Sequence, residues 1–135
     1  MPPGKRLMLA YVVALVTVVA VDAVWLGWAA RDLYARELPP ILLDAPRLAP
    51  AILFYLFYPL GLVFLALRPL PASLTDAALR SAAVGLLAYG TYDLTNLATL
   101  SAWSELLSVV DIAWGTALSA FAGALAYWAV RVRST

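Results

Sequence analysis

Residues 7–29 read LMLAYVVALVTVVAVDAVWLGWA, a run in which Asp22 is the only charged side chain. A helix needs roughly 20 apolar residues to cross the hydrocarbon core of a bilayer. Three further long apolar runs lie at about 51–67, 77–100 and 106–130. None of them alternates apolar and polar residues as the strands of a membrane barrel do. The sequence therefore predicts an all-α integral membrane protein, a single domain over residues 1–135 built as a bundle of four transmembrane helices.

The composition of the 135-residue chain points the same way. Hydrophobic residues make up 64% of it and charged residues 13%, whereas soluble domains average about 45–50% and 25%. A chain this short cannot bury so much apolar surface within itself. The net charge of +1 gives no sign of a polyanionic partner, so nucleic-acid binding is excluded. The absence of Cys and His excludes disulfides, thiolate chemistry and the usual zinc, haem and iron–sulfur sites.

Basic residues in the short connections predict the orientation. The two tails and the loop between the second and third runs carry six Lys and Arg residues, and the other two loops carry three. Both termini should therefore be cytoplasmic. The run from Lys5 onward is too long and too acidic at Asp22 for a cleaved signal peptide. In the first loop, prolines 39 and 40 break the chain, and the LPPILL run at 38–43 is expected to lie on the outer membrane surface.

Three aspartates fall inside the predicted spans, where ionisable groups are costly and usually mark a site. With a rise of about 1.5 Å per residue, Asp22 and Asp93 lie roughly 22 and 24 Å above the cytoplasmic edge. Asp111 lies about 8 Å below the outer edge of a core about 30 Å thick. All three aspartates are thus expected at one level of the outer leaflet.

Other polar and aromatic side chains share that level and are expected to form one ligand-binding cluster with the aspartates. In the third run they recur at i, i+3, i+4 and i+7, which is one helical face. The expected inward-facing cluster comprises Asp22, Tyr55, Tyr58, Tyr89, Tyr92, Asp93, Asn96 and Asp111, with Trp25 and Trp114 around it.

Three local patterns support an inward-facing site. Asp22 and Asp111 are each followed three residues later by Trp, so each indole can reach or cover the carboxylate within one turn. Pro59 leaves the carbonyl of Tyr55 without its helical donor, and such a carbonyl can line a cavity or bind a cation. Asp111 also lies on a stripe of small residues (Gly115, Ser119 and Gly123) that permits close approach of another helix.

A structural interpretation competes with the functional one. Trp28 and Trp103 are typical of an interfacial aromatic belt. Tyr89 and Tyr92 can simply donate hydrogen bonds to Asp93, and Asn96 can join helices without touching a ligand. The three acids are harder to explain in this way, because no basic residue in the spans lies near them and Arg31 is the nearest candidate.

Three acids together can share protons, accept a cationic ligand or hold a metal. No cofactor is predicted, but Asp22, Asp93 and Asp111 could provide oxygen ligands to a divalent cation such as Ca²⁺, Mg²⁺ or Mn²⁺. The leading hypothesis is binding or transport of a small cation, proton or amphipathic amine, and a transporter of four helices would require a homodimer. The alternatives are an enzyme acting on a lipid or isoprenoid, with Asp93 or Asp111 as acid–base group, and a structural subunit of a larger membrane complex.

Several motifs resemble one bacterial family of small membrane proteins. They are YGTYDLTN at 89–96, ATLSAWS at 98–104, DIAWG at 111–115, DAVWLG at 22–27 and FYLFYPLG at 54–61. The family is catalogued as domain of unknown function 2177, and the resemblance covers nearly the whole chain. It implies a four-helix protein of the bacterial inner membrane, with the lipid bilayer as its surroundings. It implies no reaction, cofactor or ligand.

Overall fold

The computed structural model describes residues 1–38 and 44–135, and the regular elements in these ranges are all helices. They are α1 (Pro3–Val24), a π-helix η1 (Trp25–Ala29), α2 (Arg31–Glu37), α3 (Leu48–Ala66), α4 (Leu74–Thr99) and α5 (Glu105–Ser134). The predicted all-α class is therefore confirmed, and each long helix begins within a few residues of its predicted start. Most of the segment expected on the membrane surface, including prolines 39 and 40, lies outside the described residues.

Local chemistry explains where the helices start. Ser73 precedes α4 and its hydroxyl accepts a hydrogen bond from the backbone N–H of Asp76 at 3.0 Å. Ser104 does the same for Leu107 at the start of α5, at 3.1 Å. Each serine satisfies one of the N–H groups that a helix leaves without a partner. These caps, absent from a hydropathy pattern, place both helix starts slightly earlier than the apolar runs.

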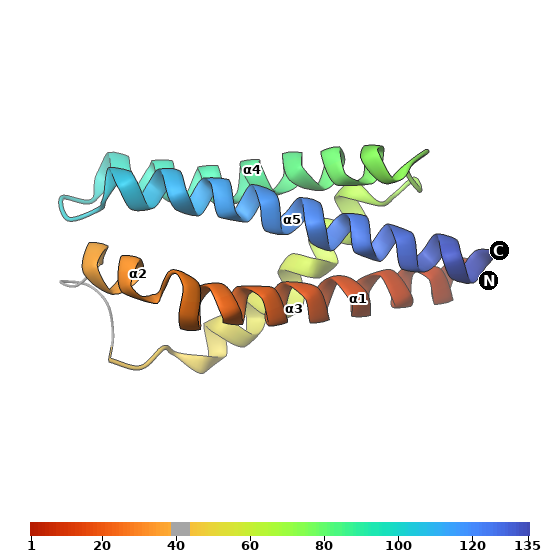
Figure 1. Ribbon diagram of the computed structural model, residues 1–135, viewed down its shortest axis with the longest axis horizontal. Helices are drawn as coiled ribbons and strands as arrows, with labels where there is room; N and C mark the ends of the chain where they lie inside the picture. Colours follow the sequence, from red (N-terminus) through yellow and green to blue (C-terminus); the bar gives the residue numbers. More distant parts are fainter. Residues whose placement is uncertain (39–43) are drawn as a thin grey trace.

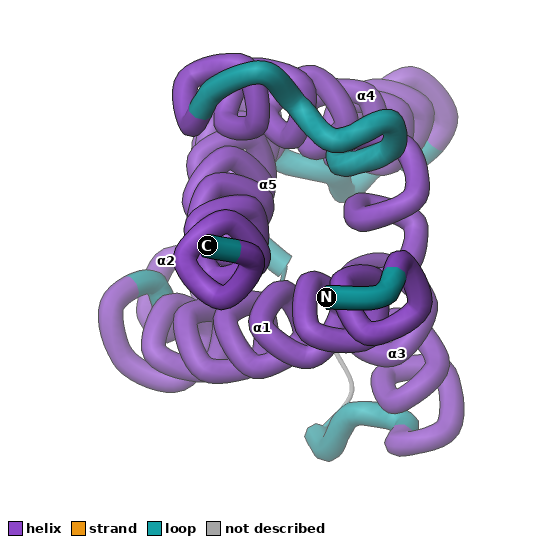
Figure 2. The backbone as a smooth tube through the Cα atoms, turned by 90° about the vertical axis from the view of Figure 1, so that its right-hand side faces the viewer, coloured by secondary structure: helices purple, strands orange, loops and turns teal. Residues whose placement is uncertain are grey.

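The long helices run lengthwise, and both termini lie at the same end of the molecule (Figure 1). α4 and α5 lie side by side and antiparallel over most of their length, and they pack more extensively than any other pair. α1 packs antiparallel against α5, and α3 crosses obliquely from α1 toward α4 (Figures 1 and 2). Two apolar clusters fill the interior, one of which, around Ala14 and Ala126, includes residues from both terminal helices.

By length and composition, three helical segments can cross a membrane: Pro3–Ala29, Leu48–Ala66 and Glu105–Ser134. The sequence predicted four, but α4 is not among the three. Its average apolarity is lowered by the face it turns to α5, where Ser81, Gly85 and Asp93 are buried. Its outward face is apolar, with Leu79 and Leu87 exposed.

The predicted small-residue stripe of α5 packs closely against α4, as expected. A methyl group added at Gly85 would meet the backbone oxygen of Gly115 at 2.5 Å, and one added at Gly115 would overlap the ring of Tyr89. A methyl group added at Gly123 would overlap the side chain of Ser81. In lipid, such close contact between helices replaces the hydrophobic driving force that is missing between them.

We predict that Gly85→Ala lowers the free energy of unfolding by about 1–3 kcal/mol, as overpacking of a tight interior does. A backbone oxygen, which cannot rotate away, blocks the new methyl group. Gly61→Ala in α3 is the matched control, because nothing lies within 4 Å of its added carbon. Unfolding of both variants in mixed detergent micelles tests this, and equal stability of the two would show that α4 and α5 are not in close contact.

Candidate functional site

A cavity of about 400 Å³ opens in the half of the bundle away from the termini. All the helices contribute side chains to it, including the short α2. Its lining comprises Asp22, Leu26, Tyr34, Leu38, Phe54, Tyr55, Ala88, Tyr89, Tyr92, Asp93, Trp103, Leu107 and Asp111. Six of the ten residues predicted for the site therefore line it, and the three aspartates are among them.

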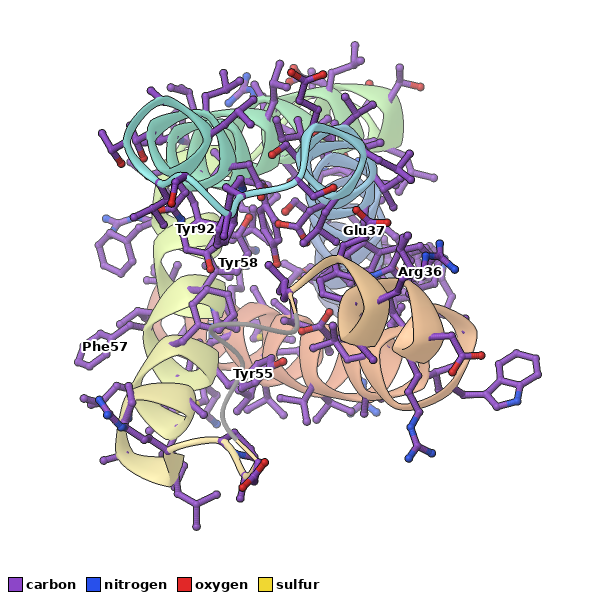
Figure 3. The ribbon with its side chains drawn as sticks, turned by 90° about the vertical axis from the view of Figure 1, so that its left-hand side faces the viewer. Arg36, Glu37, Tyr55, Phe57, Tyr58 and Tyr92 are labelled. Carbon is purple, nitrogen blue, oxygen red and sulfur yellow. The ribbon has the colours of Figure 1, made fainter. Side chains whose placement is uncertain are left out.

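Figure 3 shows how α3 and α4 turn their tyrosines toward this space. Tyr55 and Tyr58 point inward, whereas Phe57 points away from the bundle and is 63% exposed. Tyr92 lies at the rim, where its ring meets that of Trp103 edge to face at 5.5 Å. The cavity thus has aromatic walls and a rim that remains partly open.

The indoles of Trp25 and Trp114 lie outside the cavity lining and stack on each other, with their ring centres 4.2 Å apart and their planes within 5° of each other. Each indole N–H is linked by hydrogen bonds to the carboxylate of the other helix, Trp114 directly and Trp25 through Tyr34. Nε1 of Trp114 donates to Asp22 at 3.1 Å. Nε1 of Trp25 donates to the hydroxyl of Tyr34 at 3.3 Å, and that hydroxyl donates to Asp111.

Of the two roles expected for each indole, donation of its N–H to the carboxylate one turn before it was therefore wrong. α1 and α5 are antiparallel, so a step of three residues runs toward opposite ends on the two helices. Trp114 consequently lies level with Asp22, and Trp25 lies level with Asp111. The two similar Asp-x-x-Trp motifs form one reciprocal arrangement rather than two separate sites.

Asp22 is well supplied with hydrogen-bond donors. It is only 5% exposed, and it accepts hydrogen bonds from the hydroxyl of Tyr55 and from the indole of Trp114. A carboxylate can accept hydrogen bonds on both oxygens. Each oxygen of Asp22 has one donor, so its hydrogen-bonding capacity is met within the cavity wall.

Asp93 differs from Asp22, because it is 1% exposed and neither of its oxygens accepts a hydrogen bond from the described residues. Asp93 and Asp111 line the same cavity. A buried carboxyl without a donor is costly in its charged form. Asp93 is therefore the carboxyl of this site that the described residues leave without a partner.

The three aspartates do not form the common ligand set suggested for a divalent cation. In residues 1–38 and 44–135, no group of three acidic side chains lies close enough to hold a metal ion. Asp22 accepts hydrogen bonds from Tyr55 and Trp114, and Asp111 accepts one from Tyr34. The sequence predicted the shared depth of the three, but it could not predict what lies between them.

Four predicted site residues lie outside the cavity lining. Trp25 and Trp114 form the stack behind it, and Tyr58 bonds to the hydroxyl of Ser119 at 2.5 Å while packing against Tyr89. Asn96 lies one turn beyond Asp93 and is half-buried, outside the cavity.

Seven lining residues were not among those predicted for the site, and two of them, Trp103 and Tyr34, carry hydrogen-bonding groups. Trp103 was assigned to an interfacial belt, but the turn between α4 and α5 folds it onto the cavity, where Nε1 donates to Ser108 at 3.0 Å. Tyr34 was not singled out, because it lies in a polar loop. It reaches Asp111 from α2, which follows the π-helix η1 and contacts α5. Burial, and then the hydrogen bond to Asp111, raise the pKa of the Tyr34 phenol.

A second contact fastens α2 to the start of α5. The hydroxyl of Ser104 donates to Glu37 at 2.5 Å and holds the pKa of that carboxyl below its usual value. Arg36 also pairs with Glu37, at 3.4 Å. Arg31, the basic residue nearest to the acids in sequence, is exposed and forms no ion pair with them within the described residues.

We predict that Trp114→Phe lowers the free energy of unfolding by about 1–3 kcal/mol, because it leaves one oxygen of the buried Asp22 without a donor. Trp28→Phe is the control, since Trp28 is 80% exposed and its change should stay within about 0.5 kcal/mol. Unfolding in mixed micelles measures both. Adding Asp22→Asn to Trp114→Phe should recover part of the loss, and no recovery would contradict the assigned bond.

We predict that acidic pH weakens the attachment of α2 to the start of α5. The pKa of Glu37 is lower in the folded protein, so its contact with Ser104 is intact above about pH 4.3, the ordinary carboxyl value. The contact is lost as the pH falls through the lowered pKa. Hydrogen exchange of residues 31–38, corrected for the intrinsic rate, should therefore accelerate in acid.

Glu37→Gln should show the faster exchange already at neutral pH, while Asp32→Asn on the same helix should keep the wild-type profile. Exchange that does not respond to acid or to Glu37→Gln would show that the contact does not hold α2.

Comparison with known proteins agrees with the membrane character of the chain. A family model described as a predicted membrane protein, domain of unknown function 2177, matches residues 7–128. No curated protein and no solved structure matches the chain. The match spans the helices, the Asp-x-x-Trp motifs and the whole cavity, so the chain belongs to the family of predicted membrane proteins catalogued as domain of unknown function 2177.

Proposed function

We propose that the chain crosses the bacterial inner membrane four times, with both termini in the cytoplasm and the cavity in the outer leaflet. Support comes from α4, which lies along α5 and turns exposed leucines such as Leu79 and Leu87 outward. Its polar residues face protein, which allows a helix of modest average apolarity to lie in lipid. The excess of basic residues in the tails and in the loop before α4 supports the orientation.

In this setting, we propose that the cavity binds a small organic ammonium ion with an apolar part. The observation that carries the proposal is Asp93, a carboxyl that lines the cavity with no donor for either oxygen. A buried charged or polar group without a partner is costly and is usually explained by a role. An ammonium group supplies both the missing hydrogen-bond donors and the missing positive charge.

The charge balance of the lining favours a cation over an anion. Three aspartates line the cavity, and no Lys or Arg does so among the described residues. Neither of the ion pairs, Arg36–Glu37 and Arg80–Asp76, includes a residue of the cavity lining. The negative charge of the cavity is therefore left for a ligand to neutralise.

The walls favour an organic cation over a bare ion. Phe54, Tyr55, Tyr89, Tyr92 and Trp103 all line the space, and aromatic faces attract ammonium groups. The volume of about 400 Å³ lies at the small end of the range for small-molecule sites, roughly 300–1,000 Å³. A bare metal ion would use neither the volume nor the rings.

The other hypotheses predict a different path or a different ligand for the same cavity. A transporter would need a path to the cytoplasmic side, for which a homodimer is the natural arrangement. An enzyme acting on a lipid or isoprenoid would use the Asp93–Asp111 pair as acid and base, and would accept an uncharged substrate. A purely structural subunit would bind neither kind of molecule. Charged and uncharged probes of one shape therefore distinguish these functions.

We predict that the protein in phosphatidylcholine nanodiscs binds hexylammonium saturably and binds hexanol at least about tenfold more weakly. A hydrogen bond to a charged group contributes about 1.5–3 kcal/mol, so Asp93→Asn should weaken hexylammonium binding by about 10- to 100-fold. The intrinsic fluorescence of Trp103, in the lining, reports binding.

Asp76→Asn is the matched control, because it makes the same change on the same helix at a half-buried site outside the cavity, paired with Arg80. It should bind hexylammonium as the wild type does. Equal binding of hexanol and hexylammonium by the wild type would overturn the proposal and favour an uncharged substrate. Absence of binding by both probes would favour the structural role. Both of these outcomes are measured on the wild-type protein, so neither depends on the folding of a variant.

A further inference from the structure

The Asp93–Asp111 pair carries a further inference, which rests on the proposed binding of an ammonium ion. The two carboxyls line the same cavity, and their hydrogen-bond partners differ. Asp111 accepts a hydrogen bond from the hydroxyl of Tyr34, whereas neither oxygen of Asp93 has a donor among the described residues. Burial without a donor disfavours the charged form of a carboxyl. In the empty cavity a proton therefore belongs on Asp93, whose side chain is 1% exposed.

The groups around the pair leave it no other source of positive charge. From α1 it is faced by Asp22, which is already bonded to Tyr55 of α3 and Trp114 of α5. From α2 it is faced by Tyr34, which as a neutral phenol donates only one proton, already given to Asp111.

α4 adds Tyr89 and Tyr92, both neutral phenols in the lining. No basic side chain lines the cavity within the described residues. The proton on Asp93 is therefore the only positive charge that can offset the second carboxyl.

An ammonium ion can take over this role completely. With the proton in place, the pair carries one negative charge, on Asp111. With an ammonium ion bound and the proton gone, two carboxylates and one cation again sum to one negative charge. The net charge of the buried site is unchanged by the exchange, so the large cost of adding a charge to a medium of low dielectric constant is avoided.

We infer that an organic ammonium ion and one proton compete for the Asp93–Asp111 pair, so that binding of the cation releases one proton from the protein. The proton leaves Asp93 as the ammonium group takes its place between the carboxyls. The site is thus a one-for-one exchanger of a proton and an organic cation. A gradient of either ion would shift the occupancy of the other, because such linkage is reciprocal.

The number of protons released can be measured by calorimetry. The wild type in phosphatidylcholine nanodiscs is titrated with hexylammonium near pH 7, in phosphate and in HEPES, neither of which carries a net positive charge and whose ionisation enthalpies differ. An alkylammonium group resembles Lys, with a pKa of about 10.4, so at this pH every released proton comes from the protein. The dependence of the binding enthalpy on the buffer should give about one proton released per cation bound, and the affinity should rise about tenfold per pH unit while the pair holds its proton.

Asp93→Asn removes the exchangeable proton and keeps the charge of Asp111. Its residual binding should release no proton and should not depend on pH, whereas Asp76→Asn should release one proton as the wild type does. Binding of hexylammonium by the wild type without proton release would overturn the exchange and leave the proposed ligand class standing. Failure of the wild type to bind hexylammonium at all would overturn the ligand class itself, and the exchange with it.

Discussion

The structure depends on the need to supply hydrogen-bond donors to carboxylates that are held away from water. A buried carboxylate without donors costs several kcal/mol or more, so a bundle that keeps such groups must bring donors to them. Tyr55 and Trp114 meet this need at Asp22, and Tyr34 does so at Asp111. These donors come from α2, α3 and α5. The arrangement of the helices around the cavity, including the contact of α2 with α5, follows from where those donors must be.

Burial departs from the pattern of a soluble protein. Small residues and three aspartates are buried together with a few larger apolar residues such as Leu62 and Leu118, while Leu79, Phe57 and Val109 are among the many large apolar residues on the outside. Lipid solvates those exposed side chains, so burying them brings little gain, and small residues that allow close packing hold the helices together. Close contact of α4 with α5 then leaves room for side chains only where α1 and α3 diverge from that pair, and the cavity lies there.

Much of the site was predictable from residue type and depth. Asp22, Asp93 and Asp111 were placed at one level by counting residues along helices, and all three line one cavity. The inward direction of Asp111 followed from the small-residue stripe on its face. Tyr34 and Trp103 could not be predicted in this way, because each lies in a connection whose path is not periodic. The sequence of a connection does not show how that connection packs against the helices it joins.

The sequence by itself determined the helical membrane architecture, the family and the depth of the acids. These depend on apolar length and on a fixed rise per residue, which are properties of one segment at a time. Only the tertiary structure decided which donor serves which acid. The crossed Trp25–Trp114 arrangement follows from the antiparallel packing of α1 against α5, and Asp93 is left without a donor among the described residues. Such pairings depend on the relative position of helices far apart in the chain, which no single segment encodes.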